Sequence, residues 1–221
     1  FVGGYAASNR IEDLADQSEG IRRVAICRMD VDNLGQAFLA GFEQPDQTDP
    51  VQRMKYVNLF RAAAEQAAAL NAVFGHVMDM DDVHNASITH LAVITVPTAF
   101  ALAQKLHLSG KQVIEAVAAG YEAGARIGET INPSSYKYWH TTAVVGAFSS
   151  GATASKLLGL TEEQIVNCFG SAGTQAAGLW EFLASGSMSK VLHTANANLC
   201  GMRAAELAKL GFTGAPTILE G

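Results

Sequence analysis

Apolar and small residues recur at helical spacing over almost the whole chain after residue 50. Residues 51–73 carry this pattern and predict one long helix or two shorter ones. Residues 111–127 form a second amphipathic stretch, whose apolar face consists of Val113, Val117, Ala118, Tyr121 and Ala125. Residues 142–158 form a third that is rich in Gly, Ala and Ser. Because small residues let helices approach closely, we expect 142–158 to be a central, buried helix.

Start and stop signals predict the remaining helices. One helix should contain Pro97 near its start and end near residue 108. Thr161 and Gln164 have the spacing of a capping box, which marks the start of another. Residues 189–210 form a last helix, with Gly211 as its C-cap. The body of the chain, residues 48–221, is therefore predicted to be mainly α.

The first 47 residues differ from the rest in their pattern of apolar and polar residues, and this pattern predicts a short α/β segment. Val24–Met29 has the composition of a short buried strand, and residues 36–42 are helical in pattern. The polar stretch 44–50, with two prolines, is expected to be a linker or loop. We therefore divide the chain into a segment 1–47 and a helical domain 48–221.

Composition narrows the class of protein. Of 221 residues, 49% are hydrophobic and 16% charged, which supports a sizeable core. The net charge of -6 and the absence of a basic stripe disfavour nucleic-acid binding. Three widely spaced cysteines argue against a structural zinc site or a disulfide framework. The longest apolar run, residues 91–103, is too short to span a bilayer, so we expect a cytoplasmic protein without a membrane partner.

Titratable residues concentrate between Gly75 and His90. The members are His76, Asp79, Asp81, Asp82, His84 and His90. If the helix continues, His76, Asp79 and Val83 share a face. Three interpretations are open at this point: an exposed acidic helix end, a divalent-metal site with Asp and His ligands, or a proton-transfer site.

Two further segments carry candidate chemistry. His140 lies at or just before the start of the helix 142–158, where the positive helix end favours a neutral imidazole. Lys190 and His193 are neighbours at another helix start, a plausible cradle for a carboxylate. Both segments also have an interpretation without chemistry. His140 would then be a hydrogen-bonded histidine in an aromatic patch, and Lys190 and His193 would lie at a solvated helix end.

These segments together resemble one family. GHVMDMDDVHNASITH (75–90), KYWHTTAVVGAFSSGATASKLLGL (137–160) and GLWEFLASGSMSKVLHTANANLCG (178–201) are similar to motifs of the MmgE/PrpD family, and GFTGAPTILEG (211–221) resembles the sequence leading into its lid. The resemblance runs from about residue 60 to 221. It implies a helical domain, a homodimer and a site that uses neither cofactor nor metal.

The resemblance also implies roles for individual residues. The catalytic positions of the family fall on Asp79, His90, His140 and Lys190, and substrate-binding positions on Val83 and His193. The other members of the 75–90 cluster then take supporting or surface roles. Two residues depart from the family pattern. Val83 occupies a position where the family usually has Thr, and Leu91 one where it usually has Pro.

The activity implied is that of a lyase acting on a small di- or tricarboxylate. We expect proton abstraction α to a carboxylate, with 2-methylcitrate dehydration as the preferred outcome and decarboxylation or epimerisation as variants. His90 or His140 would act as base and acid, Asp79 would orient an imidazole, and Lys190 would bind a substrate carboxylate. The chain stops where the lid should begin, so we expect it to hold part of a site, and an inactive structural fragment is one alternative.

Residues 1–47 resemble a different protein. RVAICRMDVDNLGQAFLAGF (23–42) is similar to a palm-domain segment of the large subunit of type III CRISPR complexes. In that palm, Asp30 and Asp32 would present carboxylates to a nucleotide-bound metal. A metal-dependent nucleotide-binding module is therefore the alternative from another class. The other interpretation of residues 1–47 is a divergent helical N-terminus of the same enzyme.

Overall fold

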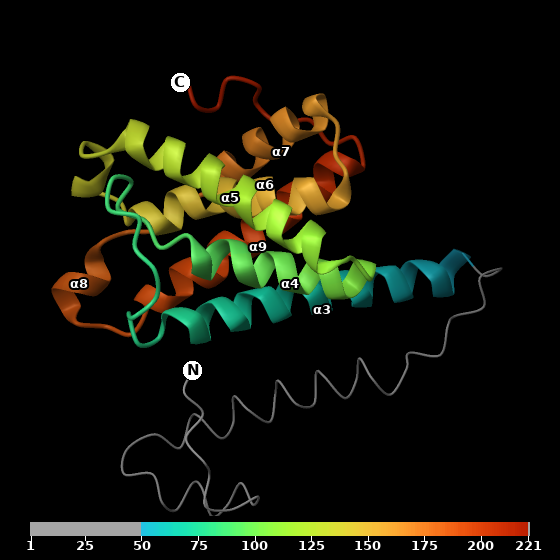
Figure 1. Ribbon diagram of the computed structural model, residues 1–221, viewed down its shortest axis with the longest axis horizontal. Coiled ribbons are helices and arrows are strands. Elements are labelled where there is room, and N and C mark those ends of the chain that lie inside the picture. Colours follow the sequence, from blue (N-terminus) through green and yellow to red (C-terminus); the bar gives the residue numbers. More distant parts are fainter. Residues whose placement is uncertain (1–49, 221) are drawn as a thin grey trace, which may run out of the picture. The chain divides into compact units, whose positions relative to one another are not determined.

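Helices dominate the part of the chain that can be described (Figure 1). The structure, a computed structural model, describes residues 50–220, and its side chains from residue 63 onward. The elements are α3 (Pro50–His76), α4 (Ala92–Leu106), α5 (Gly110–Ile131), η1 (Ser135–Lys137), α6 (Thr141–Leu158), α7 (Glu162–Gln175), α8 (Glu181–Ser185) and α9 (Lys190–Lys209). Over these residues there is no strand, which confirms the prediction of a mainly α fold.

Several expectations fall outside the described residues. These are the strand Val24–Met29, the helical stretch 36–42, and the two palm-like carboxylates of Asp30 and Asp32. The division of the chain after residue 47 stays a prediction.

Helix α6 is the central element, as its small-residue composition predicts. It contacts α4, α5, α7 and α9, and most of its residues are buried. Two of its buried hydroxyl groups are hydrogen-bonded inside the bundle: Ser149 donates to the Gly120 carbonyl at 2.8 Å, and Ser150 donates to the Asn198 carbonyl at 3.1 Å. These two hydroxyls replace apolar bulk in the core and keep their hydrogen-bond partners.

Helix α5 buries a different face from the one expected. Its amphipathic pattern suggested a core stripe of larger residues, but Ala116, Gly120, Gly124 and Gly128 are the buried ones. A Cβ at Gly120 would come within 2.7 Å of the Thr95 methyl group, so only glycine allows α5 to lie this close to its neighbours. The larger apolar side chains flank the contact instead of forming its centre.

The helix ends follow the sequence signals closely. Thr161 and Gln164 form the expected capping box at the start of α7, with Gln164 N donating to Thr161 Oγ1 at 3.3 Å. Gly211 follows α9 with a positive φ of 89°, the left-handed conformation that glycine adopts without strain. Over the described residues, none of the helices is both long and apolar enough to cross a membrane.

The contact between α6 and α9 depends on Gly201. A Cβ at this position would lie 2.6 Å from the Ala147 carbonyl oxygen and 2.5 Å from the Ser150 Cβ. We therefore expect Gly201→Ala to lower the free energy of unfolding by about 1–3 kcal/mol, because the two backbones must separate. Urea denaturation measures this change. Gly110→Ala is the matched control, since its Cβ meets nothing within 4 Å; equal effects of the two substitutions would contradict the close-contact argument.

Candidate functional site

The segment between α3 and α4 is a loop that carries most of the titratable cluster. Helix α3 ends at His76, and Asp79 lies in the following turn with a positive φ of 52°. The expectation that His76, Asp79 and Val83 share a helix face is therefore wrong. Asp79, Asp81 and Asp82 follow within six residues of His76, and carboxylates are unfavourable at the negative end of a helix, which gives a physical reason for the early end.

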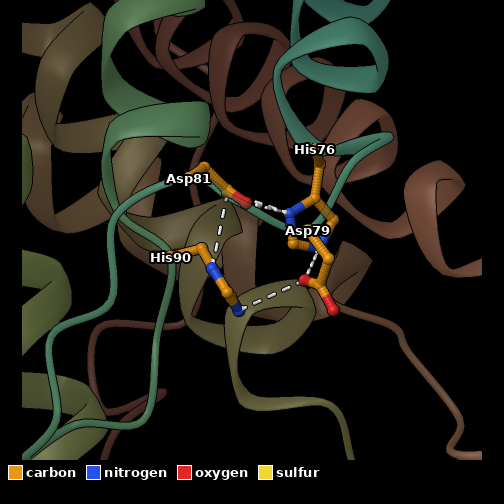
Figure 2. A group of neighbouring side chains, drawn as sticks. All are labelled: His76, Asp79, Asp81 and His90. Carbon is orange, nitrogen blue, oxygen red and sulfur yellow. Dashed lines mark hydrogen bonds and ion pairs between the residues drawn. The ribbon is translucent and has the colours of Figure 1, made fainter.

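Asp81 lies between two imidazole rings (Figure 2). His76 Nδ1 is 2.9 Å from Asp81 Oδ2 and 3.0 Å from Oδ1, and His90 Nδ1 is 3.4 Å from Asp81 Oδ2. The two rings approach each other edge to face, with centroids 4.7 Å apart. A carboxylate in this place favours a proton on the Nδ1 atom of each ring, so that each Nε2 faces away from Asp81.

Asp79 stands on the opposite side of the same two rings. Its Oδ1 is 3.9 Å from His76 Nε2 and 4.0 Å from His90 Nε2. Lys190, the first residue of α9, donates to the same oxygen at 2.5 Å. The loop and the start of α9 therefore bring a carboxylate, two imidazoles and an ammonium group together.

His140 and His193 form a second pair beside this cluster. His140 is the residue preceding α6 and is 3% exposed, and its Nδ1 lies 3.0 Å from Nδ1 of His193 on α9. One of these nitrogens must donate and the other accept, so the pair shares a single Nδ1 proton when both rings are neutral. Trp180 and Phe182 line His140, with ring centroids 5.2 and 5.8 Å away.

Two contacts join the pair to the cluster. The His90 backbone N–H donates to Thr142 Oγ1 at 3.1 Å, which ties the end of the loop to the first turn of α6. The rings of His76 and His140 are stacked with centroids 6.3 Å apart. Residues from four segments, the end of α3, the loop, the start of α6 and the start of α9, thus form one site.

The electrostatics of the cluster favour a charged His90. Its interaction with Asp81 raises the pKa of His90 above the usual range, against the opposing effect of burial. The hydrogen bond from Lys190 lowers the pKa of Asp79. Burial by itself would raise the pKa of Asp81, but its interactions with His76 and His90 hold that pKa well below its usual value. Both carboxylates are therefore ionised at neutral pH.

His140 has the opposite character. Burial lowers the pKa of His140 to about 3, and the positive charges of neighbouring groups act in the same direction. Burial also lowers the pKa of His193. The sequence predicted a neutral His140 from its place at a helix start; the neutral state agrees, and its main cause is burial.

The structure brings together most of the residues that the sequence singled out. Asp79, His90 and Lys190 are in direct contact or within 4.0 Å, and the pair of His140 and His193 adjoins them. Val83 is 54% exposed in the loop, so its role in substrate binding stays a prediction.

His76 and Asp81 are more central than the sequence suggested. The family resemblance implied supporting or surface roles for them, yet His76 is 1% exposed and Asp81 contacts both imidazoles. A turn has no fixed periodicity, so spacing in the sequence could not reveal this arrangement. By contrast, Asp82 does support the loop, because it accepts from Ala92 N at 2.9 Å and Tyr121 Oη at 2.7 Å.

The donor atoms are also of a kind that holds a metal ion. Ligand atoms of His76, Asp79, Asp81 and His90 can be chosen that all lie within 4.8 Å of one another. Imidazole and carboxylate groups suit divalent transition metals. In the arrangement described, the ammonium group of Lys190 supplies the positive charge beside Asp79.

The fold and site define a helical protein in which imidazole, carboxylate and ammonium groups gather at the ends of three helices. This chain belongs to the MmgE/PrpD family, because the model of the MmgE/PrpD N-terminal domain matches residues 5–221. The match confirms the family resemblance carried by the motifs, and it begins nearer to the N-terminus than those motifs do.

Curated relatives point in the same direction. The chain is 31% identical over 185 residues to a cis-aconitate decarboxylase-like protein, oryM, of Aspergillus oryzae, covering 79% of this chain and 38% of that protein. It is 35% identical over 161 residues to a cis-aconitate decarboxylase of Aspergillus terreus, covering 70% of this chain and 33% of that protein. The chain thus spans about a third of the length of these relatives.

A short third match concerns another class of protein. Over 42 residues the chain is 48% identical to the CRISPR system single-strand-specific deoxyribonuclease Cas10/Csm1 (subtype III-A) of Mycobacterium tuberculosis, covering 19% of this chain and 5% of that protein. This agrees with the resemblance of residues 1–47 to a palm-domain segment.

Proposed function

We propose that the protein is a lyase acting on a small tricarboxylate, and that its reaction is the decarboxylation of cis-aconitate or a close analogue. The observation that carries this proposal is the meeting of Lys190, Asp79 and His90, which offers a cation and a protonated imidazole to one anionic substrate. The similarity to a cis-aconitate decarboxylase and to a cis-aconitate decarboxylase-like protein supports the choice of cis-aconitate.

Lys190 binds and neutralises a substrate carboxylate in this proposal. Loss of CO₂ leaves an electron pair on the carbon framework, and that charge spreads onto a neighbouring carboxylate. An ammonium group placed beforehand stabilises the developing charge more than it stabilises the ground state. Asp79 holds the ammonium in place through the 2.5 Å contact, and the substrate exchanges with or joins that carboxylate.

His90 is the proton donor. Its interaction with Asp81 raises its pKa, so its protonated form persists to higher pH than that of a free imidazole. The carbon–carbon bond to the leaving carboxylate breaks, its electrons stay on the carbon framework, and the proton of His90 forms the new carbon–hydrogen bond. CO₂ leaves, and His90 regains a proton from solvent, so each turnover consumes one proton.

Dehydration of 2-methylcitrate is the second candidate. It needs a base that removes the proton α to a carboxylate and an acid that protonates the departing hydroxyl group. His140 is buried and neutral, whereas the raised pKa of His90 favours its protonated form. These opposite characters within one site favour such a reaction. The products distinguish the candidates, because dehydration gives water and an unsaturated tricarboxylate, and no CO₂.

The test offers both substrates to the complete product of the gene. We expect CO₂ release and proton uptake with cis-aconitate, measured by coupled CO₂ assay and by pH-stat, and a weaker or absent dehydration of 2-methylcitrate. Dehydration without CO₂ release would replace the first candidate by the second. If neither compound is turned over and neither raises the melting temperature, the proposal of a tricarboxylate lyase is wrong.

A further inference from the structure

The two imidazole rings of the cluster are held so that both Nε2 atoms face Asp79 (Figure 2). Asp81 lies behind the rings, 2.9 Å from Nδ1 of His76 and 3.4 Å from Nδ1 of His90. In metal sites, a carboxylate behind a ligating histidine fixes the tautomer and leaves the other nitrogen free to ligate. Asp81 has this position for two histidines at once.

His76 Nε2 is an independent indication that a ligand belongs here. His76 is 1% exposed, and over the described residues its Nε2 atom is buried without a hydrogen bond. The atom lies 3.9 Å from Asp79 Oδ1, beyond hydrogen-bonding distance. A buried polar atom without a partner is costly, and an electron-pair acceptor between it and Asp79 would remove that cost.

We propose that this cluster binds a divalent transition-metal ion such as Zn²⁺ or Co²⁺, and that the ion inhibits the enzyme by displacing Lys190. The ligands are Nε2 of His76, Nε2 of His90 and the carboxylate of Asp79. The ion is no cofactor of the proposed reaction. Only the inhibition rests on the proposed function; the binding does not.

The distances suit this ligand set. Metal–ligand bonds of about 2.0–2.1 Å in a tetrahedral site place neighbouring ligand atoms roughly 3.4 Å apart. The two separations from Asp79 Oδ1 are 3.9 and 4.0 Å, so each must shorten by about half an ångström. Binding of the ion therefore requires a small closing movement of the loop that carries Asp79 and His90, and it leaves the fourth position for water or a substrate carboxylate.

Lys190 and the ion compete for one place. Lys190 Nζ is 2.5 Å from the oxygen that would ligate the ion, and two cations at this distance repel each other strongly. Removal of the ammonium group should therefore strengthen metal binding by about tenfold or more, while the same substitution weakens the proposed catalysis. A residue that merely stabilises the fold would not produce opposite effects of this kind.

The test is a titration with Co²⁺, whose visible absorption reports tetrahedral coordination without any assay of activity. We expect a saturable band with one ion per chain, loss of affinity by about 100-fold or more in His76→Ala, and an increase in Lys190→Ala. His84→Ala and His107→Ala remove histidines that are not among the proposed ligands, so they are matched controls and should bind as the unaltered protein does. Melting curves establish that the variants are folded.

The outcomes separate the two proposals. A saturable Co²⁺ band that His76→Ala abolishes and Lys190→Ala strengthens supports the metal site, whether or not cis-aconitate is turned over. If turnover is present, Zn²⁺ should inhibit it and a chelator should reverse the inhibition. The metal site would be overturned by the absence of a saturable band, by equal binding in His76→Ala, or by unchanged affinity in Lys190→Ala. Because Lys190 is partly exposed, we expect its variant to fold, so the test stays decisive even if His76→Ala does not fold.

Discussion

Lys190→Ala should lower kcat/KM for cis-aconitate by about 10²–10³-fold. The ammonium group is the cation that contacts Asp79, at 2.5 Å, and in the proposed reaction it stabilises the charge left when CO₂ departs. Because this interaction strengthens in the transition state, kcat should fall as well as the affinity for substrate. Steady-state kinetics with the complete gene product measures both parameters.

Two further variants isolate the cause. Lys190→Arg keeps the positive charge with a different shape, so it should retain more activity than Lys190→Ala. Lys111→Ala removes a lysine whose side chain is 86% exposed and should change kcat/KM little. If Lys190→Ala left kcat and KM unchanged, Lys190 would have no part in catalysis, and the proposed mechanism would be wrong.

The helical body of this protein was accessible from its sequence. The small residues of 142–158 predicted a buried central helix, and α6 (141–158) is that helix. The capping box at Thr161 and the glycine after α9 placed helix ends within a residue or two. These features succeed because helix periodicity and end signals are local, so neighbouring residues are enough to specify them.

The face by which a helix packs was harder to predict. On α5 the amphipathic pattern indicated Val113 and Tyr121, whereas Gly120 and Gly124 are the buried residues. A hydrophobicity pattern counts how apolar a side chain is, but close backbone packing selects the smallest side chain. Which face of α5 is buried, the more apolar one or the one with the smallest side chains, depends on the surface of α6 against which it packs. That surface is a property of the tertiary structure and cannot be deduced from the sequence of α5.

The site shows the same limit more sharply. His90, His140 and Lys190 could be selected as separate segments, but His76 and Asp81 could not be placed, because Asp79 turns the chain with a positive φ. That turn aims Asp81 at both His76 and His90, a geometry that residue spacing does not contain. Alternatives such as metal ligation and proton transfer use the same residue types, so orientation is needed to weigh them.

His90→Asn should lower kcat/KM by about 10²–10⁴-fold, because it removes the proposed proton donor. The pH dependence gives a more specific expectation. Since the pKa of His90 is raised above its usual 6.5, the protonated form persists to higher pH than in a free imidazole and is lost as the pH rises through the folded-state pKa. Activity of the unaltered protein should therefore decline on the alkaline side, and the residual activity of His90→Asn should lack this decline.

The acid side of the profile tests the partner residue. Burial holds the pKa of His140 at about 3, so this imidazole stays neutral over the whole range in which His90 titrates and should add no step between pH 5 and 8. His107→Asn is the matched control for His90→Asn, because His107 caps α4 in a left-handed conformation that asparagine tolerates. An alkaline decline that survives in His90→Asn would assign the proton donor to another group, and His193, which shares a proton with His140, would be the next to replace.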